Sequence, residues 1–203
     1  MGVFGQLQGN NGNHGLMRLL GYQDVVSLDS RGRFRIPDDL AGMLQRALGS
    51  LQRSGAPQPP AVFERLSFYF VPGTQKRMFL YPAPNIRLAV ESFDNPPPGL
   101  SPDVVRRARD YFYLRMRFVE ADKQNRLVIP EGLREHAGID EHVQQITLVA
   151  QNYWLALSRT ELMEQRAAEA GDAFEEAADE FLDPVRRPPS GLTGELPTTD
   201  QQS

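Results

Sequence analysis

The chain has 203 residues, 40% of them hydrophobic, so it can bury a core as one compact body or as two small ones. It has no cysteine and three histidines, which excludes disulfides and thiolate metal sites and leads us to expect no metal and no cofactor. A net charge of -4 argues against a nucleic-acid partner only if the charge is spread evenly, because Lys and Arg that neutralise phosphates supply most of DNA affinity.

Two polar ends flank the part of the chain that has hydrophobic patterning. Residues 1–20 begin with a stretch rich in Gly, Asn and Gln, and residues 184–203 are rich in Pro, Ser, Gly and Thr, so we predict a disordered N-terminal extension and a disordered tail. Between them the order strand, turn, strand, helix, two strands and helix occurs twice. We assign residues 21–92 to a first repeat, 93–115 to a connecting loop and helix, and 116–183 to a second repeat with a C-terminal helix.

The repeat is visible in the residues themselves at an offset of 93 positions. Six identities fall within fifteen positions and give the pattern Asp-x-x-x-Arg-φ-x-Ile-Pro-x-x-Leu, where φ is an apolar residue. They align Val26 with Val119, Asp29 with Asp122, Arg33 with Arg126, Ile36 with Ile129, Pro37 with Pro130 and Leu40 with Leu133. We name the two copies the first box (residues 29–40) and the second box (residues 122–133).

Each box starts with the residues of a tight turn. Asp29 and Asp122 can cap a turn with their side chains, while Gly32 and Asn125 tolerate a positive φ. We therefore predict a first turn from Asp29 to Gly32 and a second turn from Asp122 to Asn125. We assign these four residues to turn geometry and not to ligand contact.

A short strand and a helix follow each turn. Apolar residues alternate with others, which places one set of side chains on the buried face of a strand and the arginines on the opposite face. The buried set is Phe34, Ile36, Leu127 and Ile129. Pro37 and Pro130 lack the N–H that a strand ladder needs and fit the first turn of a helix, so we predict that the strand ends there and a short helix begins.

The later elements of the two halves also correspond. The predicted strands and helical stretches lie at 78–81 and 84–92 in the first half and at 153–157 and 159–182 in the second. Between the halves, Ser101 and Pro102 form an N-cap and first-turn pair for a helix that ends near Arg115. Residues 49–60 have no counterpart in the second half and are interpreted as an insertion.

The C-terminal helix concentrates the negative charge. Nine acids and one base lie between Thr160 and Asp183, so this stretch carries -8 and the remainder of the chain carries +4. A protein binds DNA with a local basic patch and not with its average charge. The acidic total therefore does not exclude DNA as a partner.

Residues 28–37 and 121–130 resemble the two Asp-x-x-x-Arg boxes of the MraZ family of bacterial transcription regulators. The second box continues into residues 133–139, which are similar to the helix that follows it in that family, and residues 78–82 match the family's first-half strand. The likeness spans roughly residues 21–165, and two paired boxes are far more specific than one.

This resemblance implies a β-rich α+β fold of tandem AbrB-like swapped-hairpin β units, with peripheral helices and a pseudo-twofold internal repeat. It also implies ring-like homo-oligomers and binding to short repeated operators upstream of cell-division and cell-wall genes. Three departures leave the operator sequence and the ring size open: Asn125 replaces the second glycine, about eighteen additional residues precede the first half, and residues 49–60 lengthen it.

The resemblance and the strand pattern together point to a DNA-contacting surface, because a two-stranded ribbon fits the major groove and Arg can pair with guanine there. The candidate DNA contacts are Arg31, Arg33, Arg35, Lys123 and Arg126. The first box carries more positive charge than the second, so we expect DNA affinity to depend on it more.

Two alternatives stay open. Asp29 can pair with Arg33, and Asp122 with Arg126, simply to staple each turn, an exposed interaction that contributes little to stability. The arginine-rich stretch at residues 106–117 is either a second phosphate-contacting patch or the solvated face of a helix.

Three function classes are compared. An enzyme lacks support, because the chain has no nucleophile elbow, phosphate-binding loop, zinc-ligand spacing or dinucleotide fingerprint. A DNA-binding regulator is favoured, and an AbrB-fold scaffold or antitoxin-like interaction protein is the alternative. No apolar run approaches the roughly 20 residues of a membrane span, so we expect a cytoplasmic, nucleoid-associated protein whose partners are double-stranded DNA and its own copies, without a membrane or a small-molecule substrate.

Overall fold

The computed structural model describes residues 16–19, 21–53 and 65–182, with side chains as far as residue 171. The chain is an α+β protein, rich in antiparallel β-structure, that divides into two units, residues 1–163 and 164–203. All the strands belong to the first unit. In the described stretches, no helix combines the length and the apolar composition that crossing a membrane requires.

The order of elements repeats along the chain. The first half contains β1 (Gln23–Ser27), β2 (Arg33–Arg35), α1 (Asp38–Arg53), β3 (Ser67–Pro72), β4 (Met78–Pro82), the 3-10 helix Ala83–Asn85 and α2 (Ile86–Asp94). After α3 (Pro102–Arg115), the second half contains β5 (Arg117–Glu120), β6 (Arg126–Val128), α4 (Glu131–Ala137), β7 (Gln145–Gln151), β8 (Trp154–Arg159) and α5 (Thr160–Leu182). The predicted order of two strands, helix, two strands and helix in each half is confirmed, as is the helix between the halves.

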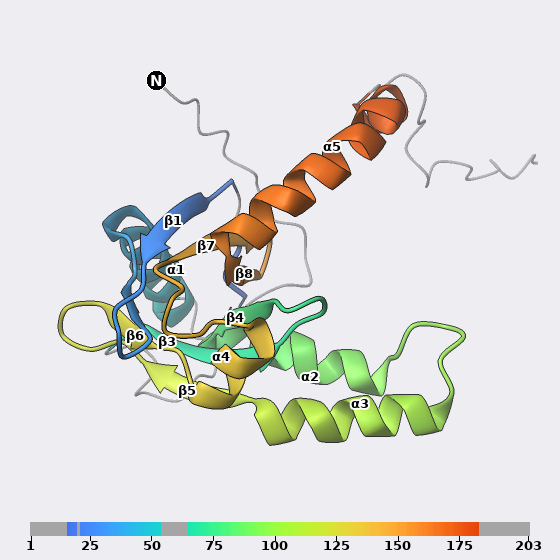
Figure 1. The fold of residues 1–203 in the computed structure, drawn as a ribbon. Coiled ribbons are helices and arrows are strands. Elements are labelled where there is room, and N and C mark those ends of the chain that lie inside the picture. Colours follow the sequence, from blue (N-terminus) through green and yellow to red (C-terminus); the bar gives the residue numbers. More distant parts are fainter. Residues whose placement is uncertain (1–15, 20, 54–64, 183–203) are drawn as a thin grey trace, which may run out of the picture. The chain divides into compact units, whose positions relative to one another are not determined.

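Strands of the two halves interleave in one six-stranded sheet with the order β1-β7-β8-β4-β3-β5 (Figure 1). The first strand of each half pairs with the other half, β1 with β7 and β5 with β3. Exchanging each strand for its equivalent (β1 for β5, β3 for β7, β4 for β8) reproduces the same order read backwards. The sheet therefore has a pseudo-twofold axis between β4 and β8.

A separate two-stranded ribbon, β2 with β6, joins the two boxes. At its centre Phe34 lies opposite Leu127, which is its own equivalent at the offset of 93 positions. The backbone N–H groups of Ile36 and Ile129 donate to the last residue of the opposite turn, at 2.8 and 2.9 Å. The same pseudo-twofold symmetry therefore relates the two strands of the ribbon, and the two turns lie at its opposite ends.

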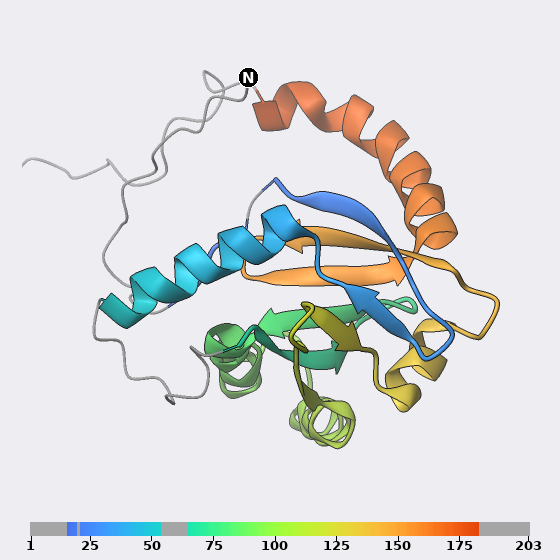
Figure 2. The same cartoon turned by 90° about the vertical axis from the view of Figure 1, so that its left-hand side faces the viewer.

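Alternation along β3 and β4 builds a hydrophobic cluster on each face of the sheet. Figure 2 shows α1 on one side of these two strands and α2 and α3 on the other. Phe68, Phe70 and Leu80 belong to the larger cluster, which also holds the buried side chains of α1 and the ribbon. Val71 and Tyr81 belong to the smaller cluster, which α2 and α3 cover. Four apolar residues of the boxes are predicted to face the core, and the prediction is confirmed because each is at most 2% exposed: Phe34, Ile36, Leu127 and Ile129.

The expected disorder of residues 1–20 is wrong for residues 16–19. Met17 and Leu19 are buried, and the side-chain amide of Asn85 accepts from the backbone N–H of Met17 at 2.8 Å and donates to its carbonyl at 2.7 Å. These two hydrogen bonds hold residues 16–19 against the 3-10 helix that follows β4. The other residues of the two ends that we expected to be disordered lie outside the described part of the chain.

The two box helices differ in length, since α1 has 16 residues and α4 has seven. Residues 49–53, the start of the stretch interpreted as an insertion, are the last part of α1, and residues 54–60 lie outside the described part. The expectation of a short helix is therefore wrong for α1, because apolar residues recur at helical spacing through Leu48 and Leu51, both buried. Helix α4 instead stops at Gly138, which has φ +64°.

Candidate nucleic-acid interface

The first and second turns share one backbone geometry. The N–H of Gly32 donates to the carbonyl of Asp29 at 2.9 Å, and that of Asn125 donates to the carbonyl of Asp122 at 2.9 Å. Gly32 has φ +70° and Asn125 has φ +56°. The predicted tight turns with positive φ at these two positions are confirmed.

An aspartate organises each turn. In the first turn, Asp29 Oδ1 accepts from the backbone N–H groups of Arg31 and Arg33, both at 2.9 Å, and Oδ2 accepts from Arg33 Nε at 2.7 Å. These bonds favour the charged carboxylate, so the pKa of Asp29 lies below its ordinary value, the backbone N–H of Arg33 being the largest cause.

The second turn repeats this arrangement. Asp122 Oδ1 accepts from the N–H groups of Gln124 and Arg126 at 2.8 and 2.9 Å, and Oδ2 accepts from Arg126 Nε at 2.7 Å. The backbone bond from Arg126, followed by its side-chain bond, lowers the pKa of Asp122 to about 2. Both aspartates therefore shape their turns, as the sequence predicts.

Arg33 and Arg126 each pair with the aspartate of their own turn, which is the alternative in which the ion pair staples the turn. Each guanidinium is bound to the aspartate that starts its own turn, at 2.7 Å. The two side chains remain 29% and 36% exposed, so they also form part of the outer surface of the ribbon. Their use as DNA contacts would have to preserve or replace these two ion pairs.

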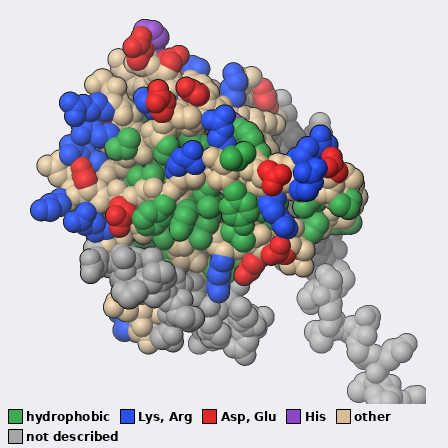
Figure 3. All heavy atoms as spheres, turned by 90° about the horizontal axis from the view of Figure 1, so that it is seen from below, with side chains coloured by type: hydrophobic (Ala, Val, Ile, Leu, Met, Phe, Trp, Pro, Cys, Tyr) green, Lys and Arg blue, Asp and Glu red, His purple; other side chains and the backbone are tan. Residues whose placement is uncertain are grey.

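The other three candidate contacts differ in their partners. Arg35 pairs with Asp38 at 2.7 Å in an exposed salt bridge. Arg31 and Lys123 are exposed, and within the described residues neither forms an ion pair. Lys123, Arg35 and Arg126 line one shallow hollow, which brings cations of both halves together at one end of the ribbon. Figure 3 shows Lys and Arg side chains gathered at the end of the molecule that carries β6 in Figure 1.

The arginine-rich stretch at residues 106–117 favours the solvated-face alternative. All its arginines have partners close by in the structure. Arg106 and Arg107 bind Asp103, Arg109 binds Asp94, and Arg115 and Arg117 donate to backbone carbonyls. A phosphate would have to compete with these local partners.

Sequence reasoning missed Arg134 of α4, which covers the first turn. A Cβ placed on Gly32 would lie 2.8 Å from Arg134 Cδ, and Arg134 Nε is buried without a hydrogen-bond partner among the described residues. The equivalent of Arg134 in α1 is Ala41, whose side chain ends at Cβ. This difference explains why glycine stands in the first turn while the second accommodates Asn125, and comparing the two helices at the offset of 93 could have found it.

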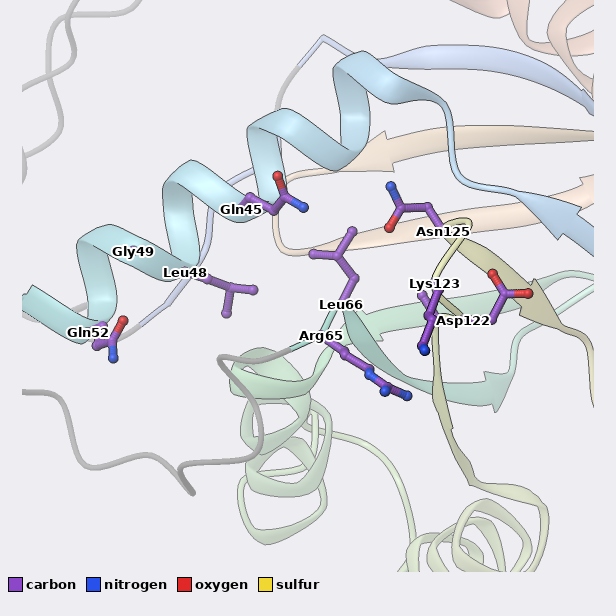
Figure 4. A pocket seen from close by; sticks show the side chains of 10 residues that line it. Gln45, Leu48, Gly49, Gln52, Arg65, Leu66, Asp122, Lys123 and Asn125 are labelled. Atoms are coloured by element: carbon purple, nitrogen blue, oxygen red, sulfur yellow. The ribbon is translucent and has the colours of Figure 1, made fainter.

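Sequence reasoning also missed Arg65. It lies two residues before β3 and lines a hollow of about 490 Å³ with Lys123 and Asn125 of the second turn (Figure 4). No signal in the sequence marks it, because its equivalent at the offset of 78 that relates Phe68 to Ile146 is the apolar Val143.

Among the residues that the structure describes, no group of three or more His, Asp or Glu side chains is arranged to hold a metal ion. No protein-family model and no curated protein matches the chain. The likeness to the MraZ family therefore rests on the sequence alone, that is, on the two boxes, their spacing and the shorter matches at residues 78–82 and 133–139.

Proposed function

We propose that the chain is a sequence-specific DNA-binding transcription regulator of the MraZ kind, acting on short repeated operators upstream of cell-division and cell-wall genes. The observation that carries the proposal is the ribbon β2–β6, to which each half contributes one strand. Its outer face bears Arg33, Arg35 and Arg126, and the turns at its ends bear Arg31 and Lys123.

The shape and charge of this ribbon support DNA as its ligand. A two-stranded antiparallel ribbon can enter the major groove, where arginine donors match the acceptors of guanine and neighbouring cations hold phosphates. Arg31 and Lys123 can bind a phosphate without sharing their charge with an internal carboxylate, whereas Arg33 and Arg126 are each held by an aspartate. We therefore assign phosphate contacts to Arg31 and Lys123 first and a positioning role to Arg33 and Arg126.

The interleaved sheet supports tandem AbrB-like swapped-hairpin units as the architecture. In each half the first strand leaves its own half to pair with the other, and the two box strands meet on the pseudo-twofold axis. A swapped arrangement of two equivalent units in one chain has these features.

Exposed apolar residues support assembly with other copies. β1 and β5 are the edges of the sheet, and their equivalent residues Val25 and Phe118 are 45% and 49% exposed. Leu114 of α3 is 71% exposed, and Figure 3 shows hydrophobic side chains gathered in the middle of the face seen from below. An unpaired edge with an apolar patch is typical of a subunit contact, and two different edges suit the head-to-tail contacts of a ring.

Gel-shift experiments test the DNA proposal. The chain should retard a duplex that carries the DNA upstream of its own gene and should bind a shuffled duplex of the same composition much more weakly. Equal binding to both duplexes would contradict sequence specificity.

Light scattering tests the assembly. The wild type should be a closed oligomer at micromolar concentration, and the double variant Leu114→Glu/Phe118→Glu should dissociate, because burying two carboxylates in an apolar contact is costly. A monomeric wild type would contradict the ring.

A scaffold or antitoxin-like interaction protein is the second candidate function. The observation in its favour is that Arg33, Arg35 and Arg126, three of the five candidate contacts, are already paired with aspartates. This candidate predicts an intact oligomer that retards neither duplex. Fluorescence microscopy of the tagged chain separates the two in cells, since only the regulator should follow the nucleoid within the cytoplasm.

A further inference from the structure

Each turn faces a hollow built by the other half of the chain. The second turn borders the hollow of about 490 Å³ described above, which α1 and the two residues before β3 complete. The first turn borders a hollow of about 360 Å³, completed by α4 and the residues that lead into β7. The two hollows are equivalent under the pseudo-twofold symmetry, and we name them the second-turn hollow and the first-turn hollow.

The charges around the two hollows differ in sign. Arg65 and Lys123 line the second-turn hollow, and Asp122, the single acid among its described lining residues, is bound to Arg126. Asp140 and Glu141 line the first-turn hollow, in addition to the stapled aspartate of that turn, and Arg134 is the one cation among the described residues that line it. A site for an anion can therefore form at the second turn but not at the first.

Arg65 and Lys123 are both available to a ligand. Both are exposed, and within the described ranges neither lies in a salt bridge. Figure 4 shows the Lys123 side chain extending toward the side of the hollow on which the Arg65 guanidinium lies. Gln45, Gln52 and Asn125 add neutral amide groups to the lining, and the one carboxylate among its described residues, that of Asp122, is held by Arg126.

We propose that Arg65 and Lys123 form a phosphate-binding site at the second turn, occupied by a backbone phosphate when DNA lies along the ribbon. The inference rests on the proposed function, since the ligand is DNA. The guanidinium offers planar paired donors and the ammonium a point charge, a combination that matches the several acceptor oxygens of a phosphate. Both side chains are exposed at the hollow, so a phosphate can reach them while the turn contacts the groove.

The site makes the second turn the stronger phosphate contact of the two. The acids of the first-turn hollow repel a phosphate that approaches there, whereas Arg65 adds a cation that the second box itself does not contain. DNA affinity should therefore depend on a residue that lies 58 positions before its partner Lys123 and outside both boxes.

The test measures the affinity for duplex DNA at several salt concentrations for the wild type and four variants. Arg65→Gln and Lys123→Gln each remove one cation of the site. Arg46→Gln is the matched control, because Arg46 is an exposed cation of α1 next to Gln45 that does not line the hollow. Arg65→Lys keeps the charge, and thermal melting checks that all variants fold.

Arg65→Gln and Lys123→Gln should each reduce the slope of log affinity against log salt by about one unit and weaken binding about tenfold near 0.1 M salt, while Arg46→Gln changes the slope little. Arg65→Lys should retain the wild-type slope. If the wild type binds DNA but Arg65→Gln has the same salt slope and affinity as Arg46→Gln, the phosphate site is overturned and the proposed function stands. If the wild type binds no duplex at any salt concentration, both are overturned.

Discussion

The two turns have the same backbone but different surroundings. Both are organised by an aspartate and both have a positive φ at their last residue. Arg134 covers the first turn, which borders an acidic hollow, whereas the second turn is open and borders a cationic one. The two halves thus share the geometry of the turns and differ in the residues that each contributes to the turn of the other.

This difference changes the ranking of the two boxes. Counting charges within the boxes places the first above the second, which is the basis of the expectation that DNA affinity depends more on the first. If only the cations that form no ion pair within the described residues are counted, Arg31 remains at the first turn, and Lys123 and Arg65 remain at the second. We now expect the second turn to contribute at least as much.

The largest effect should fall at the centre of the ribbon, where the two boxes do not differ. Phe34→Ala should lower the free energy of unfolding by about 3–5 kcal/mol and Leu127→Ala by about 2–5 kcal/mol, because each leaves a cavity in the shared core. Urea unfolding followed by circular dichroism measures both. Val128→Ala is the control, since Val128 is 48% exposed on the same ribbon, and should change the value by less than about 0.5 kcal/mol. Large losses for only one of the pair would contradict a core shared through the pseudo-twofold axis.

A smaller effect should separate the two turns. Gly32→Asn keeps a residue type that tolerates positive φ but must displace the flexible Arg134 side chain, so it should cost about 1 kcal/mol. The reverse exchange, Asn125→Gly, should change stability by less than about 0.5 kcal/mol.

The variant Arg134→Ala provides the background for this comparison. Without the arginine side chain, the cost of Gly32→Asn should largely disappear, as a double-mutant cycle would show. A cost that persists in the Arg134→Ala background would mean that the backbone, and not the contact, distinguishes the turns.

The smallest expected effect is the loss of stability that the turn aspartates cause at low pH. The pKa of Asp122 is about 2 in the folded chain and returns to 3.8 when the turn is lost. A lowered pKa in the folded state means that the carboxylate stabilises the fold above about pH 4 and that this contribution is lost as the pH falls toward about 2. Between these values the wild type should lose more stability than Asp122→Asn, measured by urea unfolding, and Asp29→Asn should differ from the wild type in the same direction. Parallel pH profiles for the wild type and Asp122→Asn would contradict the stapled turn.

Local chemistry made much of this fold predictable. The turns, the buried faces of the box strands and the start of α3 at Pro102 depend on residues within a few positions of one another, and the structure confirms all three. Ser101 accepts from the N–H of Val104 as an N-cap, as expected.

Long-range placement was not predictable. The hydrogen bond between Asn85 and Met17 joins residues 68 positions apart, and no sequence pattern near Met17 predicts it. Arg65 and Arg134 reach the turns only because β1 and β5 cross between the halves. For this reason the candidate site could be predicted as a set of exposed cations, but not the division of those cations into stapled and available ones.

The most direct test of DNA binding through the ribbon and its turns compares two double variants with equal changes in charge. Arg31→Gln/Lys123→Gln removes the two available cations of the turns, and Arg106→Gln/Arg107→Gln removes two that are paired with Asp103 on α3. We expect the first to reduce the salt slope of duplex DNA affinity by about two units, with a loss near fiftyfold at about 0.1 M salt, and the second to change it little. Equal losses for the two double variants, or no binding by the wild type, would contradict the proposal.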